Sequence, residues 1–156
     1  MWFGFPTRAN CEGVSCLQGE TIISHPLNLT VLVTVAALLM YFMLIIRVSI
    51  ARVKAKISAP AMTGDPEMER ALRVQENTLE WLPIFVPALW MFAIYWNDRL
   101  AALLGVVWIL GRIVYAFAYW AGKNRSPAFG VQMLATFILL FGAAAGAIRT
   151  MMVTGI

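Results

Sequence analysis

The stretch RVQENTLEWLPIFVPALWMFAIYW, residues 73–96, joins a polar beginning to a long apolar run and indicates the class of this protein. Arg73, Asn77 and Glu80 are spaced at i, i+4 and i+7, so they share one face of an α-helix within an arc of about 100°. Residues 81–96 carry no charge. Because ionisable groups are costly where a helix enters a membrane, they indicate a functional site at this position.

The composition of the chain is that of a membrane protein. Of its 156 residues, 61% are hydrophobic and 13% are charged, and a soluble domain of this length could not bury so much apolar side chain. The net charge of +4 does not indicate a nucleic-acid partner, because the basic residues lie at the ends of apolar segments, where they act as topology signals. We expect no secretory signal peptide, since residues 1–25 lack a basic start with a continuous apolar core.

Four apolar segments are long enough to cross a membrane, which takes about 20 helical residues. The spans are expected at about residues 27–47, 69–96, 100–122 and 128–149, within one transmembrane domain over residues 27–150. The sequence therefore predicts an all-α integral membrane protein, a four-helix bundle. Pro83 and Pro87 lie inside the second span, where a packed membrane bundle tolerates them but they are expected to bend the helix. The small residues 142–146 suit close helix packing better than ligand binding.

The basic residues also predict the orientation. Eight of them lie in or beside the connections between spans one and two and between spans three and four, against three near the opposite ends. We therefore expect both connections in the cytoplasm, with both termini and an N-terminal segment of residues 1–26 on the extracytoplasmic side. Both a bacterial inner membrane and an endoplasmic reticulum fit this topology.

The N-terminal segment contains both cysteines and the single histidine. Cys11 and Cys16 are separated by four residues and match no metal-binding pattern, so no metal site is expected. They can form a disulfide if this segment faces an oxidising compartment, and free thiols are the equal alternative. His25 precedes the first span directly and is interpreted as an interfacial residue rather than a catalytic one.

Polar residues gather at the expected cytoplasmic side in three groups. They are Arg52, Lys54 and Lys56 after the first span; Arg70, Arg73, Gln75, Asn77 and Glu80 at the start of the second; and Arg112, Tyr115 and Tyr119 in the third, followed by Lys123 and Arg125. Structural explanations exist for each group: positive-inside residues for the lysines, an aromatic belt for the tyrosines and an internal ion pair for the second group. Arg112 suits a structural pairing with Glu80 as well as it suits ligand contact.

The chemistry of these groups suits a small zwitterion with more than one carboxylate. Guanidinium groups bind carboxylates with two parallel hydrogen bonds, while Glu80 can receive an ammonium group. The neighbouring apolar helices offer a lining for a lipophilic second substrate. A two-substrate site at the membrane surface is therefore the functional hypothesis that the residues support.

The segments ERALRVQENTLEWLP (residues 69–83) and GRIVYAFAYWAGKNRSPAFG (residues 111–130) resemble the MAPEG family, the membrane-associated proteins in eicosanoid and glutathione metabolism. The resemblance covers about residues 47–148, and its most specific element is the spacing Arg-x3-Asn-x2-Glu-x2-Pro. The connection SAPAMTGDPEMER (residues 58–70) matches in register. The resemblance implies a homotrimer of four-helix subunits that holds glutathione between neighbouring subunits near the cytoplasmic surface.

The resemblance also implies roles for single residues. Carried over position by position, the glutathione contacts are Arg52, Arg73, Gln75, Asn77, Glu80, Tyr115 and Tyr119. Arg125 lies near the family's thiolate-stabilising arginine, although the segment before it is shorter than in leukotriene synthase, and Tyr119 and Arg112 are the alternatives for this catalytic role. Val53 and Trp81 also depart from leukotriene synthase, which favours a general transferase or peroxidase.

The implied function is that of a membrane-bound glutathione transferase with peroxidase capacity, using glutathione as co-substrate. A guanidinium group lowers the pKa of the glutathione thiol from about 8.5, and the thiolate attacks a lipophilic electrophile or reduces a lipid hydroperoxide from the membrane. One alternative is a non-catalytic lipid- or glutathione-binding scaffold of the same family. Another is a small proton-coupled carrier that uses Glu76 and Glu80 as a relay, which the lack of an inverted repeat disfavours.

Overall fold

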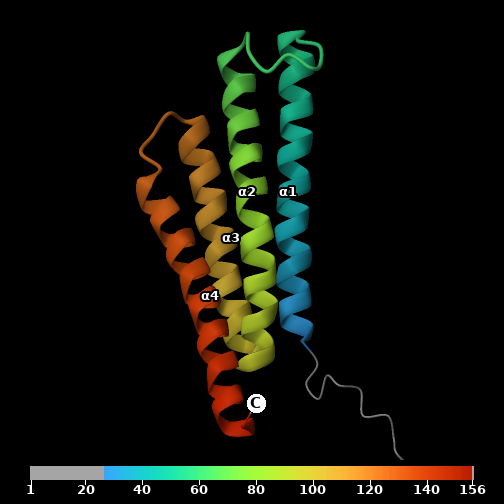
Figure 1. Ribbon diagram of the computed structural model, residues 1–156. Helices are drawn as coiled ribbons and strands as arrows, with labels where there is room; N and C mark the ends of the chain where they lie inside the picture. Colours follow the sequence, from blue (N-terminus) through green and yellow to red (C-terminus); the bar gives the residue numbers. More distant parts are fainter. Residues whose placement is uncertain (1–26, 156) are drawn as a thin grey trace, which may run out of the picture.

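The computed structural model describes residues 27–155, which fold into four long α-helices lying side by side (Figure 1). They are α1 (Asn28–Ala55), α2 (Pro66–Tyr95), α3 (Asp98–Trp120) and α4 (Ser126–Thr154). All four are long and apolar enough to cross a membrane. The prediction of an all-α multi-pass membrane bundle is therefore confirmed. The residues Cys11, Cys16 and His25 lie outside the described part of the chain.

The connections divide the bundle into two ends. The α1–α2 connection (residues 56–65) and the α3–α4 connection (residues 121–125) lie toward the same end of the bundle, which we call the polar end (Figure 1). The α2–α3 turn and the C-terminus of α4 lie at the opposite end. The predicted cytoplasmic connections thus lie on the same side of the bundle.

The helices extend beyond the apolar segments because their polar ends are capped. Helix α2 begins at Pro66, a residue suited to the first helical position, and the side chain of Asp65 accepts a hydrogen bond of 2.8 Å from the backbone N–H of Met68. Helix α1 continues to Ala55 and ends at Lys56, which adopts a left-handed conformation with φ 57°. Arg52 and Arg73 therefore both lie on helices at the polar end.

Helices α2 and α3 form the centre of the bundle. Helix α1 packs on one side of this pair and α4 on the other, and α1 and α4 do not pack on each other (Figure 1). The core contains Phe85 of α2 stacked on Trp108 of α3, with ring centroids 4.0 Å apart, together with the buried Leu89 and Leu139. Large apolar side chains such as Leu103 and Phe141 are exposed on the outer surface, as expected where the solvent is lipid.

The small residues of α4 allow α2 to approach closely. A Cβ atom added at Gly142 would lie 2.5 Å from Cε2 of Phe92, and one at Gly146 would lie 2.6 Å from Cβ of Tyr95. The indole N–H of Trp96 donates a hydrogen bond of 2.7 Å to the carbonyl of Gly142. Gly142, Ala143 and Gly146 therefore serve packing, as interpreted from the sequence, whereas Ala144 and Ala145 are exposed.

Helix α1 begins without a side-chain cap of its own, and α3 supplies one. The two carboxylate oxygens of Asp98, the first residue of α3, accept hydrogen bonds from the backbone N–H groups of Leu29 and Thr30 at 3.1 and 2.9 Å. The hydroxyl of Thr30 also donates to Asp98, at 2.7 Å. These bonds satisfy N–H groups that the first turn of a helix leaves unpaired, and they join α1 to α3 at the opposite end.

Candidate functional site

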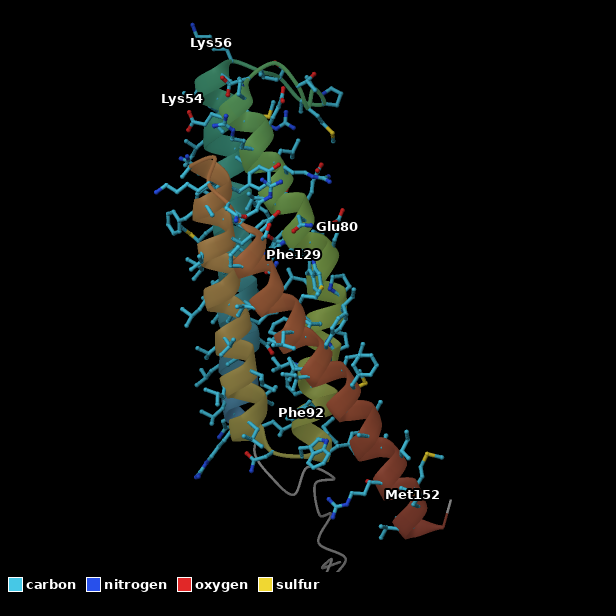
Figure 2. All side chains as sticks on the ribbon, turned by 90° about the vertical axis from the view of Figure 1, so that its left-hand side faces the viewer. Lys54, Lys56, Glu80, Phe92, Phe129 and Met152 are labelled. Carbon is cyan, nitrogen blue, oxygen red and sulfur yellow. The ribbon has the colours of Figure 1, made fainter. Side chains whose placement is uncertain are left out.

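The candidate residues extend from the tip of the polar end down into the bundle. Figure 2 shows Lys54 and Lys56 at the tip, whereas Glu80 lies farther down α2, at about the level of Phe129 in α4. Helices α1, α2 and α3 and the start of α4 each contribute side chains, as the sequence predicts. Long helices are needed for this arrangement, because the polar positions are spread over several turns of each helix.

Arg112 lies at the centre of a buried polar network. Its side chain has no exposed surface, although it carries a charge in the middle of the bundle. The guanidinium donates three hydrogen bonds: Nε to Oγ1 of Thr78 at 2.9 Å, Nη1 to Oε1 of Gln132 at 3.1 Å and Nη2 to Oδ1 of Asn77 at 3.0 Å. All three acceptors are uncharged. The carbon of the guanidinium also lies 4.9 Å from the ring centroid of Tyr115, a favourable cation–π distance.

Asn77 connects this buried network to Glu80. Its side-chain amide accepts the bond from Arg112 through Oδ1 and donates one of 3.3 Å to Oε2 of Glu80 through Nδ2. Arg112 and Glu80 are thus linked through an amide and form no direct salt bridge within residues 27–155. The arrangement fixes the orientation of Asn77 and gives the exposed carboxylate of Glu80 a defined partner.

Two other candidate residues are held by neighbouring parts of the chain. The side-chain amide of Gln75 donates a hydrogen bond of 2.7 Å to the phenol oxygen of Tyr41 on α1. Arg52 on α1 donates one of 2.6 Å to the carbonyl of Ala61 in the α1–α2 connection. Gln75 and Arg52 each use only part of their hydrogen-bonding groups in these contacts, so both can form further hydrogen bonds.

Arg125 lies over the ring of Tyr119. Its guanidinium carbon is 4.4 Å from the ring centroid, and the ring of Tyr119 is in turn 5.9 Å from that of Tyr115. Arg125 occupies the position before the first residue of α4 and is exposed. The end of α3 and the start of α4 therefore bring together an exposed cation and a phenol, two groups that can stabilise an anion.

An open pocket of about 430 Å³ lies between α2, the α1–α2 connection and Tyr119. It is lined by Met62, Thr63, Pro66, Glu69, Arg70, Leu72, Arg73, Glu76 and Tyr119. Two guanidinium and two carboxylate groups in one recess suit a zwitterion. Arg73 and Tyr119 are the two predicted site residues that line it. Of the other predicted site residues, Asn77, Glu80, Arg112 and Tyr115 belong to the network around Arg112. Gln75 on α2 and Arg52 on α1 bond to Tyr41 and Ala61, and Arg125 lies over the Tyr119 ring.

The model of the MAPEG family matches residues 30–145. This chain belongs to the MAPEG family. Human microsomal glutathione S-transferase 2 is 42% identical over 105 residues, which are 66% of this chain and 70% of the relative. Bovine leukotriene C4 synthase is 33% identical over 116 residues, 73% of this chain and 77% of the relative.

A bacterial relative is also similar to this MAPEG protein. An uncharacterised protein of Synechocystis is 48% identical over 113 residues, which are 72% of this chain and 82% of the relative. The matched residues 30–145 include every candidate site residue. The MAPEG membership confirms the family resemblance and agrees with the multi-pass membrane architecture.

Sequence reasoning missed three side chains that hold the site of this MAPEG protein together. Thr78 and Gln132 accept hydrogen bonds from Arg112, and Tyr41 accepts one from Gln75. Gln132 gave the clearest signal, because an amide within the apolar fourth segment is costly unless it is paired. Thr78 gave a weaker one, since a threonine hydroxyl in a helix usually bonds to its own backbone, as Thr78 also does to the carbonyl of Val74.

Proposed function

We propose that this MAPEG protein is a membrane-bound glutathione transferase that activates the glutathione thiol for attack on lipophilic electrophiles, with peroxidase capacity toward lipid hydroperoxides. The observation that carries the proposal is the pocket that joins Arg73 to Tyr119, with Arg125 lying 4.4 Å over the Tyr119 ring. The pocket holds groups that suit a zwitterion, and the phenol of Tyr119 in its wall lies next to the cation of Arg125. The names of the two vertebrate relatives support the same chemistry.

Glutathione carries two carboxylates and one ammonium group, and the polar end offers partners for each. In the proposal Arg73 and Arg52 bind carboxylates, which guanidinium groups do with paired hydrogen bonds. Glu80 receives the ammonium group, while Gln75 and Asn77 bind amide groups. Tyr115 contributes its ring beside Arg112.

The exposure of these groups supports a site shared between chains. The side chain of Arg73 is 60% exposed in a single chain, and Glu80 is also exposed. Charged side chains exposed where a helix enters the membrane are costly unless a ligand or a neighbouring subunit covers them. We therefore retain the proposal of a homotrimer that holds glutathione between neighbouring subunits, on the cytoplasmic side.

The chemistry begins with loss of the thiol proton to water. A guanidinium group near the sulfur favours the thiolate through Coulomb attraction and so lowers the pKa of the thiol. We assign this role to Arg125, with the Tyr119 hydroxyl as a second hydrogen-bond donor. Arg112 is less suited, because its guanidinium is buried and bonded to three side chains, and its proposed role is to position Asn77.

The thiolate then reacts in one of two ways. In the transferase reaction, sulfur forms a bond to an electrophilic carbon. In a substitution, the leaving group departs with the electron pair of its broken bond. In an addition, the electron pair of the broken double bond takes up a proton. In the peroxidase reaction, two glutathione molecules reduce one lipid hydroperoxide to an alcohol and water and are oxidised to a disulfide. Both lipophilic substrates reach the polar end from the surrounding membrane.

The test is the ultraviolet absorbance of the glutathione thiolate during titration of the purified protein in detergent near neutral pH. We expect a saturable thiolate signal that is lost in Arg73→Ala and reduced in Arg125→Ala. Lys123→Ala is the matched control, since Lys123 is a neighbouring exposed cation that does not lie over Tyr119. An unchanged signal in Arg125→Ala would reject its assignment, and saturable binding without any thiolate signal would support the scaffold alternative.

A further inference from the structure

A second pocket lies at the opposite end, between the C-terminal turns of α2 and α4. It has a volume of about 230 Å³ and is lined by Tyr95, Trp96, Gly146, Arg149, Thr150, Val153 and Thr154. Nothing in the glutathione chemistry uses these residues, because the polar end carries the whole candidate site. The pocket therefore needs an explanation of its own.

The walls of this pocket are held by close packing. The indole of Trp96 is fixed by its hydrogen bond of 2.7 Å to the carbonyl of Gly142. The missing side chain of Gly146 lets the α2 end approach so closely that an added Cβ would lie 2.6 Å from Cβ of Tyr95 and 2.9 Å from Nε1 of Trp96. The Trp96 indole is thus held beside the turn of α4 that carries Arg149, and the Tyr95 side chain begins next to the same turn.

Arg149 is a cation without an acidic partner in the described part of the chain. No carboxylate of residues 27–155 forms a salt bridge with it. Asp98, the acidic residue at the same end of the described bundle, is occupied by the N-terminus of α1. An anion from outside residues 27–155 can therefore bind Arg149 without displacing a salt bridge within them.

Mainly apolar residues flank Arg149 along the helix, apart from Thr150 and Thr154, which line the pocket. The segment from Ala128 to Ile148 is roughly 30 Å long at about 1.5 Å per residue, which matches the hydrocarbon thickness of a bilayer. Beyond Arg149, the side chains of Met152 and Val153 are 74% and 80% exposed and also apolar. The guanidinium thus lies where the hydrocarbon layer meets the lipid headgroups. At this depth the abundant anion is the lipid phosphate, which guanidinium groups bind well.

We propose that this pocket binds one phospholipid of the leaflet opposite the polar end, with Arg149 as the ligand of the lipid phosphate. Tyr95 and Trp96 form the wall at headgroup level, as aromatic residues do at membrane interfaces. The acyl chains lie along the exposed apolar side chains of the α2 and α4 surface, such as Ile94. The bound lipid joins the ends of two helices, so it stabilises the packing of α2 on α4.

The experiment is native mass spectrometry of the delipidated full-length protein, titrated with phosphatidylglycerol. We expect one lipid per chain that binds more tightly than all others, in the wild type and in Arg99→Gln. Arg99 is the matched control, because it is an exposed cation at the same end that does not line the pocket. Arg149→Gln should weaken binding of this lipid about fivefold, and Arg149→Lys should weaken it less.

Two further measurements separate the lipid from other occupants. Thr150→Leu narrows the pocket without changing its charge and should weaken the same lipid, which keeps the proposal testable if Arg149→Gln does not fold. A glycosyl diacylglycerol, which has no phosphate, should not compete for the site, and millimolar inorganic phosphate should not displace the lipid. Equal lipid binding by Arg149→Gln and Arg99→Gln would overturn the proposal, as would displacement by free phosphate or full binding of the phosphate-free lipid.

Discussion

Nη2 of Arg112 on α3 donates a hydrogen bond of 3.0 Å to Oδ1 of Asn77 on α2, and through Asn77 the buried cation is connected to the carboxylate of Glu80. The bond joins the interior of the bundle to the face that carries the candidate glutathione contacts. Because Arg112 has three uncharged acceptors and no exposed surface, we propose that it orients side chains rather than contacting a ligand.

Replacement of Arg112 by methionine should therefore reduce stability and glutathione binding together. The change removes three hydrogen bonds and leaves the buried acceptors of Thr78 and Gln132 and the partly buried one of Asn77 without this donor. The expected loss is about 2–4 kcal/mol in the free energy of unfolding. Thermal unfolding in detergent and glutathione titration measure the two effects. Arg99→Met is the control for loss of a helix cation, and equal melting temperatures for both variants would contradict the positioning role.

Because Asp98 caps α1, we expect its substitution to lower the stability of the protein without affecting glutathione binding. Asp98→Ala removes the acceptor for the N–H groups of Leu29 and Thr30 and should lower the free energy of unfolding by about 1–2 kcal/mol. Asp98→Asn keeps one side-chain oxygen and should cost less. Glutathione affinity should stay unchanged, because the cap lies at the opposite end from the candidate site. A change in affinity without a change in melting temperature would be inconsistent with a capping role.

Glu76 is expected to restrain Arg73 in the unliganded protein. The Glu76 carboxylate is 3.8 Å from the Arg73 guanidinium, and both side chains line the pocket at the polar end. A glutathione carboxylate must compete with this contact, so Glu76→Gln should tighten glutathione binding by about two- to threefold, the range expected for an exposed ion pair. Isothermal titration with glutathione measures this change.

The matched control for Glu76 is Glu69→Gln. Glu69 lines the same pocket, but its carboxylate accepts a hydrogen bond of 2.9 Å from the backbone N–H of Gly64. The Glu69→Gln substitution should therefore leave the glutathione affinity nearly unchanged. Weaker binding by Glu76→Gln would mean that Glu76 contacts the ammonium group of glutathione instead of restraining Arg73.

Replacing glycine by alanine is expected to have opposite effects on stability at two positions of α4. Gly142→Ala places a methyl group 2.5 Å from the ring of Phe92, so α2 and α4 must separate, at a cost of about 1–3 kcal/mol. Gly130→Ala meets nothing within 4 Å and should be neutral or stabilise by up to about 1 kcal/mol through helix propensity. Thermal unfolding of the two variants under the same conditions compares them, and a similar loss in both would argue against close packing at Gly142.

Much of the architecture was predictable because the chain has few alternatives in lipid. An apolar segment of about 20 residues must satisfy its backbone groups internally, so each of the four segments had to be helical. The helix ends were less predictable. Helix α1 continues to Ala55 and α2 begins at Pro66, because capping by Asp65 and the left-handed Lys56 depends on local polar contacts that hydropathy does not report.

The sequence by itself determined the membrane class, the helical faces of the polar motif and the MAPEG family, because hydropathy, residue spacing and motif identity are all local properties of the chain. Only the tertiary structure decided which charged groups are buried and what they bind. Arg112 and Tyr119 share one helical face by spacing, yet Arg112 points to acceptors on α2 and α4 while Tyr119 lies beneath Arg125. The partners of Arg112 are 20 to 35 positions away along the chain, and only the packing of three helices brings them within hydrogen-bonding distance.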